Sequence, residues 1–518
     1  MSQPLIAALQ NPALYPHPVE AFQVIETHIS WVILTGPYAY KLKKPMNFGF
    51  LDFTKLEDRG HFCNEELRLN QRLTKDLYLE VLPITGTAEA PQFGGDGPVI
   101  EYALKMRQFP QSQLLSTLQA NGELTSAHID EMAKQIAHFH LSAPKVPQEH
   151  PAGTPDEVMA PVRQNFEQIR PFLSDKADLT QLEALQAWAE SSFERLKPLL
   201  AQRKLEGFIR ECHGDIHLGN ATLIDGHVVI FDCIEFNEPF RFTDVYADTA
   251  FLAMDLEDRG LKSLARRFIS QYLELTGDYR GLELLNFYKA YRALVRAKVS
   301  LFSMPSEASP VQRATTLRQY RNYANLAESY STIPSRFLAI THGVSAVGKS
   351  NVAMRLVEAL GAVRLRSDVE RKRLFGEQQV ENTPQAGIYA ADASVATYAR
   401  LNELADTVLR AGFPVVLDAT FLKREQRDAA AKVAEATGAP FLILDCNAPQ
   451  AVIASWLAQR QANKNDPSDA TLKVIEEQQA NREPLTTEEL LLSKRVETNE
   501  SGTLDALVAH IRQNLPGL

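Results

Sequence analysis

The segment from residue 343 to residue 350 constrains the fold of this 518-residue chain more than any other. It reads GVSAVGKS, which matches the pattern G-x-x-x-x-G-K-S, and it lies between the apolar run FLAITH and a helical pattern. Glycines at these positions let backbone N–H groups approach phosphate oxygens, and the loop ends in a lysine and a hydroxyl. The segment therefore predicts a phosphate-binding loop (P-loop) between a strand and a helix.

All eight residues of this loop are expected to contact a nucleotide: Gly343, Val344, Ser345, Ala346, Val347, Gly348, Lys349 and Ser350. In such loops the lysine reaches the β- and γ-phosphates, and the last hydroxyl binds Mg²⁺. A second magnesium ligand is expected at the end of a neighbouring strand, where Asp418 follows three apolar residues in VVLDAT. The alternative for Asp418 is a cap on the next helix. The loop implies Mg²⁺ and ATP as cofactors, and it leaves GTP open as the nucleotide.

The chain is too long for one hydrophobic core, because single cores stop growing near roughly 250–300 residues. Helical periodicity ends in STIPSRF (331–337), and short apolar strands alternating with helices follow it. We therefore expect two domains, at 1–333 and 334–518. The strands of the second are expected at 337–341, 362–365, 415–417 and 441–444. This alternation predicts an α/β P-loop NTPase fold, with a parallel sheet covered by helices on both faces.

The segment LRSDVERKR places Asp368 and Arg371 three residues apart at the start of an expected helix, and therefore on one face. Beside a γ-phosphate, the aspartate can accept the proton of an attacking hydroxyl, and the arginine can bind an anionic substrate. Together with the P-loop, this D-x-x-R resembles the P-loop kinases of small molecules and polynucleotide 5′-hydroxyls, zeta toxins among them, over residues 337–515. The alternative is a helix-capping aspartate before a solvated basic turn.

Arg460 lies in WLAQRQANKNDPSDA, a helical run that continues into a polar loop. This segment looks like the lid of the P-loop kinases, in which an arginine would stabilise charge on the transferring phosphoryl group. The alternative is an ordinary surface arginine.

The chemistry of the first domain is concentrated in ECHGDIHLGNATLIDGHVVIFDCIEF, which contains the pattern H-x-D-x-x-x-x-N. It resembles the catalytic loop of the aminoglycoside phosphotransferase and choline kinase branch of the protein-kinase-like superfamily, and the resemblance covers residues 20–330. The resemblance implies that Asp215 is the catalytic base and that Asn220 and Asp232 bind Mg²⁺. It also implies that His213 has a structural role. The alternative for the whole set of residues is a polar cluster that only stabilises the loop.

Kinases of this kind also need a small-lobe lysine that is paired with a helix glutamate. Lys41 ends the segment YAYK, which resembles the kinase lysine strand, and Glu66 lies on the helix expected after it. Lys43 shares the strand face of Lys41, and Glu65 adjoins Glu66, so the choice within each pair stays open. The turn LTGPYAY lacks the glycine-rich phosphate cover of protein kinases, which leaves open a weakly binding or pseudokinase lobe.

The first domain is expected to have two lobes, in an α+β arrangement. Residues 22–44 predict an antiparallel hairpin around a Thr-Gly-Pro turn, and VIEYALKMRQF (99–109) predicts another strand. Residues 106–109 would then be the hinge that contacts adenine. We therefore expect a small lobe at about 1–110 and a helical lobe at about 111–333. One β-rich stretch at 223–232 interrupts the helical lobe.

Composition narrows the partners and the compartment. The formal charge of −10 disfavours a long nucleic acid, whose binding depends on positive charge. The four cysteines form no C-x-x-C pair, which argues against a zinc site or a disulfide framework. The sequence shows neither a leader pattern nor an apolar run long enough to span a membrane. We therefore expect a cytoplasmic protein without membrane contact, and its oligomeric state stays open.

The leading hypothesis is a bifunctional ATP-dependent kinase, in which each domain phosphorylates a hydroxyl of a small molecule. One alternative is that the P-loop domain is a regulatory ATPase or that the first domain is a binding module. Another is that the second domain phosphorylates a nucleic-acid 5′-hydroxyl or a nucleotide sugar. Acidic residues after Asp232 and the pair His138 and His140 are expected to stabilise the helical lobe rather than bind substrate.

Overall fold

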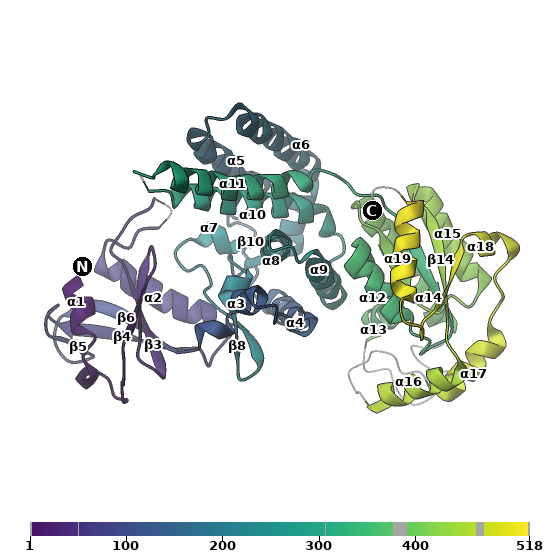
Figure 1. Ribbon diagram of the computed structural model, residues 1–518, viewed down its shortest axis with the longest axis horizontal. Helices are drawn as coiled ribbons and strands as arrows, with labels where there is room; N and C mark the ends of the chain where they lie inside the picture. Colours follow the sequence, from purple (N-terminus) through teal and green to yellow (C-terminus); the bar gives the residue numbers. More distant parts are fainter. Residues whose placement is uncertain (1–2, 50, 306, 377–390, 463–470, 516–518) are drawn as a thin grey trace. The chain divides into compact units, whose positions relative to one another are not determined.

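The structure is a computed structural model that describes residues 3–49, 51–305, 307–376, 391–462 and 471–515 (Figure 1). Contacts group the chain into two units, and each unit is made of two chain segments. The first unit comprises Met1–Leu256 and Tyr291–Ala324, and the second comprises Glu257–Ala290 and Asn325–Leu518. The boundary expected between residues 333 and 334 stays a prediction.

The first unit begins with an antiparallel sheet in the order β1-β2-β3-β6-β4-β5. Its strands are β1 (Gln23–Glu26), β2 (Ser30–Leu34), β3 (Tyr38–Lys43), β4 (Tyr78–Gly86), β5 (Pro91–Phe93) and β6 (Val99–Arg107). β2 and β3 pair around the Thr-Gly-Pro turn, with Leu34 opposite Ala39, so the predicted hairpin is confirmed. Tyr40 and Leu42 pack on the side of helix α1 (Gln3–Ala8). Since side chains alternate along a strand, Lys41 and Lys43 point to the other side, toward helix α2 (Leu56–Asn70).

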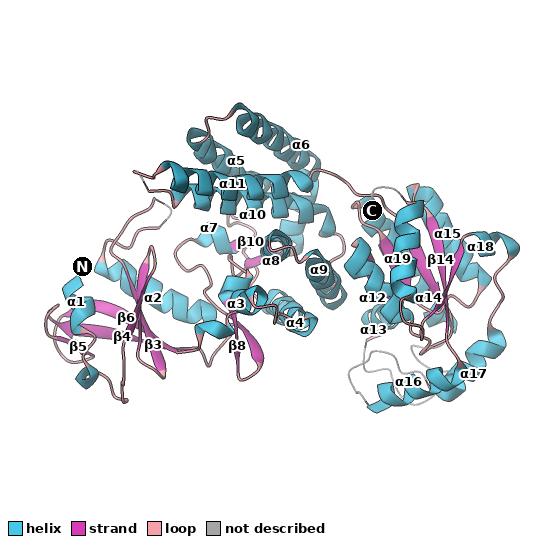
Figure 2. Ribbon diagram, viewed as in Figure 1, coloured by secondary structure: helices cyan, strands magenta, loops and turns pink. Residues whose placement is uncertain are grey.

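The rest of the first unit is mainly helical, as expected (Figure 2). The helices that lie wholly or partly in it are α3 (Leu115–Ala120), α4 (Ser126–Ser142), α5 (Pro155–Ile169), α6 (Lys176–Glu206), α7 (Glu238–Arg241), α8 (Val245–Asp258), α10 (Leu282–Phe302) and α11 (Pro310–Ser329), with short 3-10 turns at Pro12–Leu14, Gln111–Gln113, Arg170–Phe172 and Leu218–Asn220. The expected β-rich stretch is a hairpin of β8 (Ala221–Ile224) and β9 (His227–Ile230), and β7 (Ile209–Glu211) pairs with β10 (Phe242–Asp244). Asp225 and Gly226 both have positive φ, at 53° and 83°, as a two-residue hairpin turn requires.

The second unit is built on a parallel sheet in the order β12-β13-β11-β14-β15. The strands are β11 (Leu338–His342), β12 (Val363–Arg366), β13 (Val415–Asp418), β14 (Phe441–Asn447) and β15 (Ser493–Glu497). The helices are α9 (Lys262–Thr276), α12 (Lys349–Leu360), α13 (Ser367–Phe375), α14 (Ala391–Arg410), α15 (Arg424–Thr437), α16 (Gln450–Ala462), α17 (Leu472–Asn481), α18 (Thr487–Leu491) and α19 (Thr503–Asn514). The predicted α/β P-loop fold is confirmed.

Both faces of the second unit's sheet are covered. Ala339, Val416 and Leu444 belong to one apolar cluster with side chains of α12 and α19. The alternate residues Ile340 and Leu417 are also fully buried, and α14 and α15 pack together on the strands. The continuous burial of β11 and β13 explains why their residues 338–340 and 415–417 form apolar runs rather than an alternating pattern.

Within the described residues, no helix has the length and apolar composition that a membrane-crossing segment needs.

Candidate active sites

Lys41, Glu66 and Asp232 meet at one point of the first unit. The Nζ atom of Lys41 lies 2.7 Å from Oε1 of Glu66 and 2.9 Å from Oδ1 of Asp232. Glu65 instead pairs with Arg68, one turn along α2, at 2.8 Å. The structure therefore brings together the lysine, the glutamate and the aspartate that were predicted from the sequence. The glutamate that pairs with Lys41 is Glu66, not Glu65.

Lys43 belongs to the same charge cluster but lies deeper. Its Nζ atom is 2.6 Å from Oε2 of Glu66 and also contacts Glu235. The side chain of Lys43 is 1% exposed, whereas those of Lys41 and Asp232 are 16% and 41% exposed. Lys41 is thus the lysine that a nucleotide could reach, and Lys43 holds Glu66 from behind.

The two lysines determine the charge of Glu66. Burial alone would raise the pKa of this carboxyl, but Lys41 and Lys43 beside it lower the pKa to about 2. Burial raises the pKa of Glu235, although Lys43 acts against it. Glu66 is therefore ionised at neutral pH, and it can hold the Lys41 ammonium in one position.

Arg68 of α2 and Arg72, just after its end, fix this helix against β7, the strand that precedes the loop at residues 213–220. Arg68 and Arg72 both contact the Glu211 carboxylate, at 2.7 and 3.2 Å, and Arg72 also donates to the Glu211 carbonyl at 2.7 Å. From the same helix, Asn70 accepts a hydrogen bond from the backbone N–H of Cys233 at 2.9 Å. These long-range partners, which the sequence analysis missed, hold Glu66 close to Asp232.

The loop at residues 213–220 brings Asp215 and Asn220 into direct contact. The side-chain nitrogen of Asn220 donates to Oδ2 and to the carbonyl of Asp215, both at 3.0 Å. His217 lies 3.4 Å from the same carboxylate. Burial would raise the pKa of Asp215, but the His217 imidazole beside it brings the pKa to about 2. Asp255 of α8 accepts the Leu218 N–H at 3.0 Å, which anchors the loop.

Asp248 is the main support under this loop, and it is one of the acidic residues after Asp232 that were expected to stabilise the helical lobe. Its carboxylate accepts the backbone N–H groups of His213 and Gly214, both at 2.8 Å, and lies 3.2 Å from Nε2 of His140. His140 is therefore a packing residue with a polar contact. A buried carboxylate that binds two consecutive N–H groups fixes the backbone just before Asp215.

Asp232 has a strained backbone. Its φ is 66°, in the left-handed region that non-glycine residues rarely adopt. Its N–H donates to the hydroxyl of Tyr78 at 3.1 Å. Such strain persists only where the surroundings impose it, and it often marks functional sites. Here it accompanies the contact between the Asp232 carboxylate and Lys41.

The structure corrects the position expected for the phosphate cover. The Thr-Gly-Pro turn lies at the hinge, where Gln108 accepts the N–H groups of Thr35 and Gly36 at 3.1 and 2.9 Å. The turn at residues 27–29, between β1 and β2, lies instead at the Lys43 end of β3, where Ile29 accepts the N–H of Lys44 at 2.8 Å. This turn also lacks glycine. The order of the strands in the sheet determines which turn lies at the hinge and which lies at the Lys43 end of β3. The sequence pattern left this order undetermined.

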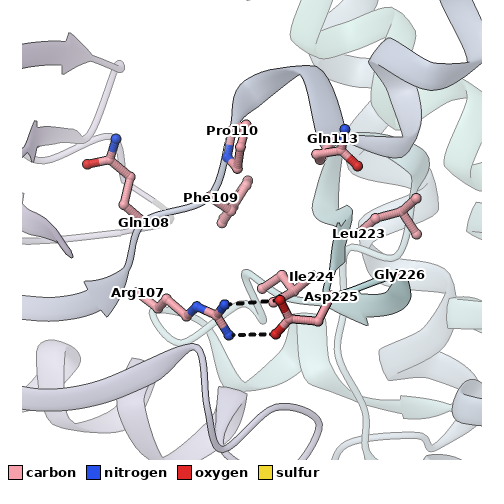
Figure 3. Close-up of a pocket in the computed structure, with 9 residues that line it drawn as sticks. All are labelled: Arg107, Gln108, Phe109, Pro110, Gln113, Leu223, Ile224, Asp225 and Gly226. Atoms are coloured by element: carbon pink, nitrogen blue, oxygen red, sulfur yellow. Dashed lines mark hydrogen bonds and ion pairs between the residues drawn. The ribbon is translucent and has the colours of Figure 1, made fainter. Parts of the chain in front are cut away.

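A pocket of about 250 Å³ lies beside the expected hinge. Figure 3 shows it between the segment 107–110 and the β8–β9 turn, with the Arg107 guanidinium paired to Asp225 at 3.1 Å. The rings of Phe109 and Phe231 lie 5.3 Å apart, within an apolar cluster that includes residues of β3 and β6. The hinge thus presents backbone groups next to apolar side chains, which is a surface suited to a flat aromatic base.

In the second unit, the P-loop connects β11 to α12 as predicted. A Cβ atom added to Gly343, whose φ is 145°, would lie 2.7 Å from the carbonyl oxygen of Cys446. Ala346 also has a positive φ, of 62°. Nζ of Lys349 donates to the carbonyl of Val344 at 2.6 Å, so the lysine folds over the loop. The close approach of Gly343 to β14 and the Lys349 contact therefore hold the loop in one shape.

Asp418, at the end of β13, suits a divalent cation. Its Oδ2 atom is buried and has no hydrogen-bond partner among the described residues. The Nε atom of Arg366 lies 3.8 Å from this oxygen. A buried carboxylate oxygen without a hydrogen bond is costly unless an ion compensates it. In the first unit, Asn220 and Asp232 likewise offer the oxygen ligands that Mg²⁺ prefers.

Asp368 and Arg371 lie on one face of α13, as predicted from their spacing, with 3.5 Å between Oδ1 and Nη1. Burial raises the pKa of Asp368; Arg371 and Arg366 act against this, and Asp418 adds to it. Asp368 is therefore a carboxylate with increased basicity close to the P-loop lysine.

Tyr398 of α14 is a residue that the sequence did not reveal. Its hydroxyl accepts a hydrogen bond from the Phe421 N–H at 3.2 Å.

Gln478 of α17 is a second residue that no local motif could reveal. Its Oε1 atom accepts the Ser345 N–H at 2.7 Å, and its Nε2 atom donates to the Ser345 hydroxyl at 3.1 Å. Beside the loop, Asp445 contacts His342 at 2.7 Å and Arg482 at 2.9 Å. The expected lid residue Arg460 falls in α16, but its side chain lies outside the described residues.

Comparison with known proteins identifies both halves. A profile of the Phosphotransferase enzyme family matches residues 63–285, and a profile described as AAA domain matches residues 338–485. Among solved structures, a choline/ethanolamine kinase family protein from Mesorhizobium loti covers 63% of this chain and 96% of its own, at 12% identity and a TM-score of 0.39. A gluconokinase from Sinorhizobium meliloti covers 35% of this chain and 96% of its own, at 21% identity and a TM-score of 0.27.

Relatives with the same extent occur among curated proteins. Uncharacterized proteins of Mycobacterium tuberculosis and Mycobacterium bovis are 30% identical over 467 residues, which is 88% of this chain and 90% of theirs. The chain therefore belongs to the family of these mycobacterial proteins, and it carries a kinase-like domain of the Phosphotransferase enzyme family followed by a P-loop kinase-like AAA domain.

Proposed function

We propose that the protein is a bifunctional ATP-dependent kinase, in which each half transfers a γ-phosphoryl group to a hydroxyl of a small molecule. One observation supports the proposal: in each half, defined contacts hold both a lysine expected to bind phosphate and an aspartate expected to accept the proton of a hydroxyl. These are Lys41 and Asp215 in the first unit, and Lys349 and Asp368 in the second. Each pair lies within a single unit.

In the first unit, Lys41 would bind the α- and β-phosphates while Glu66 holds its ammonium in place. Asp215 is ionised at neutral pH and fixed by Asn220, so it can accept the proton of an acceptor hydroxyl. Asn220 and Asp232 would hold Mg²⁺, which supplies positive charge to the phosphates. The link from Glu66 through Lys41 to Asp232 argues against the pseudokinase alternative.

In the second unit, the N–H groups of the P-loop would surround the β-phosphate, and Lys349 would exchange the Val344 carbonyl for phosphate oxygens. Asp368 would accept the acceptor proton, and its raised pKa makes it a stronger base than an exposed aspartate. Arg371 would bind an anionic group of the acceptor. Asp418 and Ser350 would hold Mg²⁺ here.

Small acceptors fit the charge of the chain better than polymers do. The net charge of −10 opposes a long polyanion, because nucleic-acid affinity depends largely on cationic contacts with phosphate. A single phosphorylated or carboxylated metabolite needs only one arginine, and Arg371 can supply that contact. We therefore propose small-molecule acceptors for both halves, and a cytoplasmic location in which ATP is abundant.

The test is a mass-spectrometric screen of a metabolite extract incubated with Mg-ATP and the full chain. Wild type is compared with Asp215→Asn and Asp368→Asn, which keep the size of each side chain but remove the base. Products that disappear in only one variant assign an acceptor to that half. No product in any sample would contradict the proposal, and acceptor-free ATP hydrolysis that survives Asp368→Asn would identify the second unit as a regulatory ATPase.

A further inference from the structure

Helix α9 belongs to the second unit, although it lies inside the segment 63–285 that matches the Phosphotransferase enzyme family. It packs against α12, the helix that begins at the P-loop, and against β12, the strand that leads into α13. Arg266 donates to the carbonyls of Ala359 and Glu358, at 2.7 and 3.2 Å. The last carbonyls of a helix have no partner within it, so Arg266 caps the far end of the P-loop helix.

Glu274, near the end of α9, binds two arginines of β12. Its carboxylate accepts from Arg364 at 2.8 Å and from Arg366 at 3.2 Å. The side chains of Glu274 and Arg364 are 12% and 6% exposed, so water screens this contact weakly. Arg366 also lies 3.8 Å from Asp418 and precedes α13 directly. Glu274 therefore fixes an arginine that lies beside the proposed cation ligand.

A second contact holds α13 itself. The hydroxyl of Tyr279 donates to Oε1 of Glu370 at 3.2 Å, and Arg373 contacts the same carboxylate as well as the carbonyl of Glu274. Tyr279 and Glu370 are fully buried. Gly277 has a φ of 73°, and a Cβ atom there would lie 2.9 Å from Nε of Arg373. The turn after α9 is thus shaped closely around an α13 side chain.

We infer that Glu274 and Tyr279 are positioning residues for the second active site, which hold α13 and Arg366 so that Asp368 and Arg371 keep their place beside the P-loop. The inference rests on the phosphoryl transfer proposed for the second unit. It assigns part of that site to a segment that neither the AAA match at 338–485 nor the P-loop motif includes. The P-loop half, cut at residue 334, would lack this support.

The need for such a support follows from the size of α13. The helix has nine residues, and isolated helices shorter than about 12–15 residues are only marginally stable in water. Its position must come from tertiary contacts, and Glu370 is its only fully buried residue among those described. A displacement of about 1 Å at a reacting group can lower the rate roughly a hundredfold. Loss of the anchors should therefore act on catalysis more than on nucleotide affinity.

The experiment uses the full chain with Glu274→Gln, Tyr279→Phe and both changes together. Glu358→Gln is the matched control. It removes the 2.8 Å ion pair between Glu358 of α12 and Arg267 of α9, and it changes no contact of α9 with β12 or α13 described above. Lys349-dependent product formation gives kcat and the KM for ATP. Amide hydrogen exchange of residues 367–375 reports the order of α13 without any acceptor.

We expect kcat to fall at least tenfold in Glu274→Gln, less in Tyr279→Phe, and most in the double variant, with an unchanged KM for ATP. Exchange in residues 367–375 should accelerate in the same order, and Glu358→Gln should match wild type in both measurements. Unchanged kcat and exchange in the double variant would overturn the inference. Equal losses in the control would also overturn it, because they would indicate a general effect on folding. If wild type forms no Lys349-dependent product, the function proposed for the second unit is wrong. The exchange data then test by themselves whether Glu274 and Tyr279 hold α13 in place.

Discussion

Oε1 of Glu66 lies 2.7 Å from Nζ of Lys41, while its other oxygen binds the buried Lys43. The carboxylate thus joins the partly exposed lysine of the first site to a lysine that water does not reach. One glutamate therefore serves both the fold and the proposed nucleotide site, and the two roles can be separated by experiment.

The first prediction concerns stability and pH. The folded pKa of Glu66, about 2, lies below its ordinary value of 4.5. A lowered folded pKa stabilises the protein above the unfolded value, and this contribution is lost as pH falls from about 4.5 toward 2. Glu66→Gln should cost the first unit roughly 3 kcal/mol at pH 7, and the difference from wild type should shrink on acidification. Thermal unfolding between pH 7 and pH 3 measures it, and a difference independent of pH would contradict it.

The second prediction separates the two lysines. Lys41→Met should abolish phosphoryl transfer by the first site with little loss of stability, because Glu66 keeps Lys43 as a partner. Lys43→Met should lower the free energy of unfolding by about 3 kcal/mol or more, because it leaves Glu235 buried without its cation. Product formation and thermal unfolding of both variants test this. An inactive but fully stable Lys43→Met protein would reverse the assignment.

Short motifs predicted the residues that lie close together in the chain. Asp215 and Asn220 are five positions apart, and their contact follows from the loop itself. Asp368 and Arg371 are one helical turn apart, so their shared face follows from helix geometry. The choice of Glu66 over Glu65 needed the rotation of α2 about its axis, which only packing decides.

The supporting residues could not be predicted, because their partners are distant in the chain or are backbone groups. Asp248 binds two N–H groups, and a backbone partner leaves no pattern in the sequence. Gln478 lies 133 positions from its partner Ser345. Strand β15 reads SKRVE and buries only Val496, so it lacks the apolar signal that revealed the other four strands.

The third prediction concerns the support under the loop at residues 213–220. Asp248→Asn should lower the stability of the first unit by roughly 3 kcal/mol, since hydrogen bonds to a charged acceptor are worth about 1.5–3 kcal/mol each. It should also reduce kcat at the first site, because the N–H groups of His213 and Gly214 lose their acceptor just before Asp215. Lys349-dependent product should be unaffected. Asp76→Asn, at an exposed aspartate, is the control and should leave both quantities at their wild-type values.

The last prediction concerns the shape of the P-loop. Gly343→Ala would place a Cβ atom 2.7 Å from the Cys446 carbonyl at a φ of 145°, so either the loop or β14 must move. Because phosphate is bound by N–H groups in fixed directions, ATP affinity of the second unit should fall at least tenfold. Gly438→Ala is the matched control: its φ is 66°, but no atom of the described residues lies within 4 Å of the added atom. That change should cost about 1 kcal/mol of stability and leave ATP affinity unchanged. Isothermal titration with ATP measures the affinity of both variants, in a Lys41→Met background that silences the first site. Equal affinities of the two variants would contradict the prediction, because they would show that the loop tolerates the displacement.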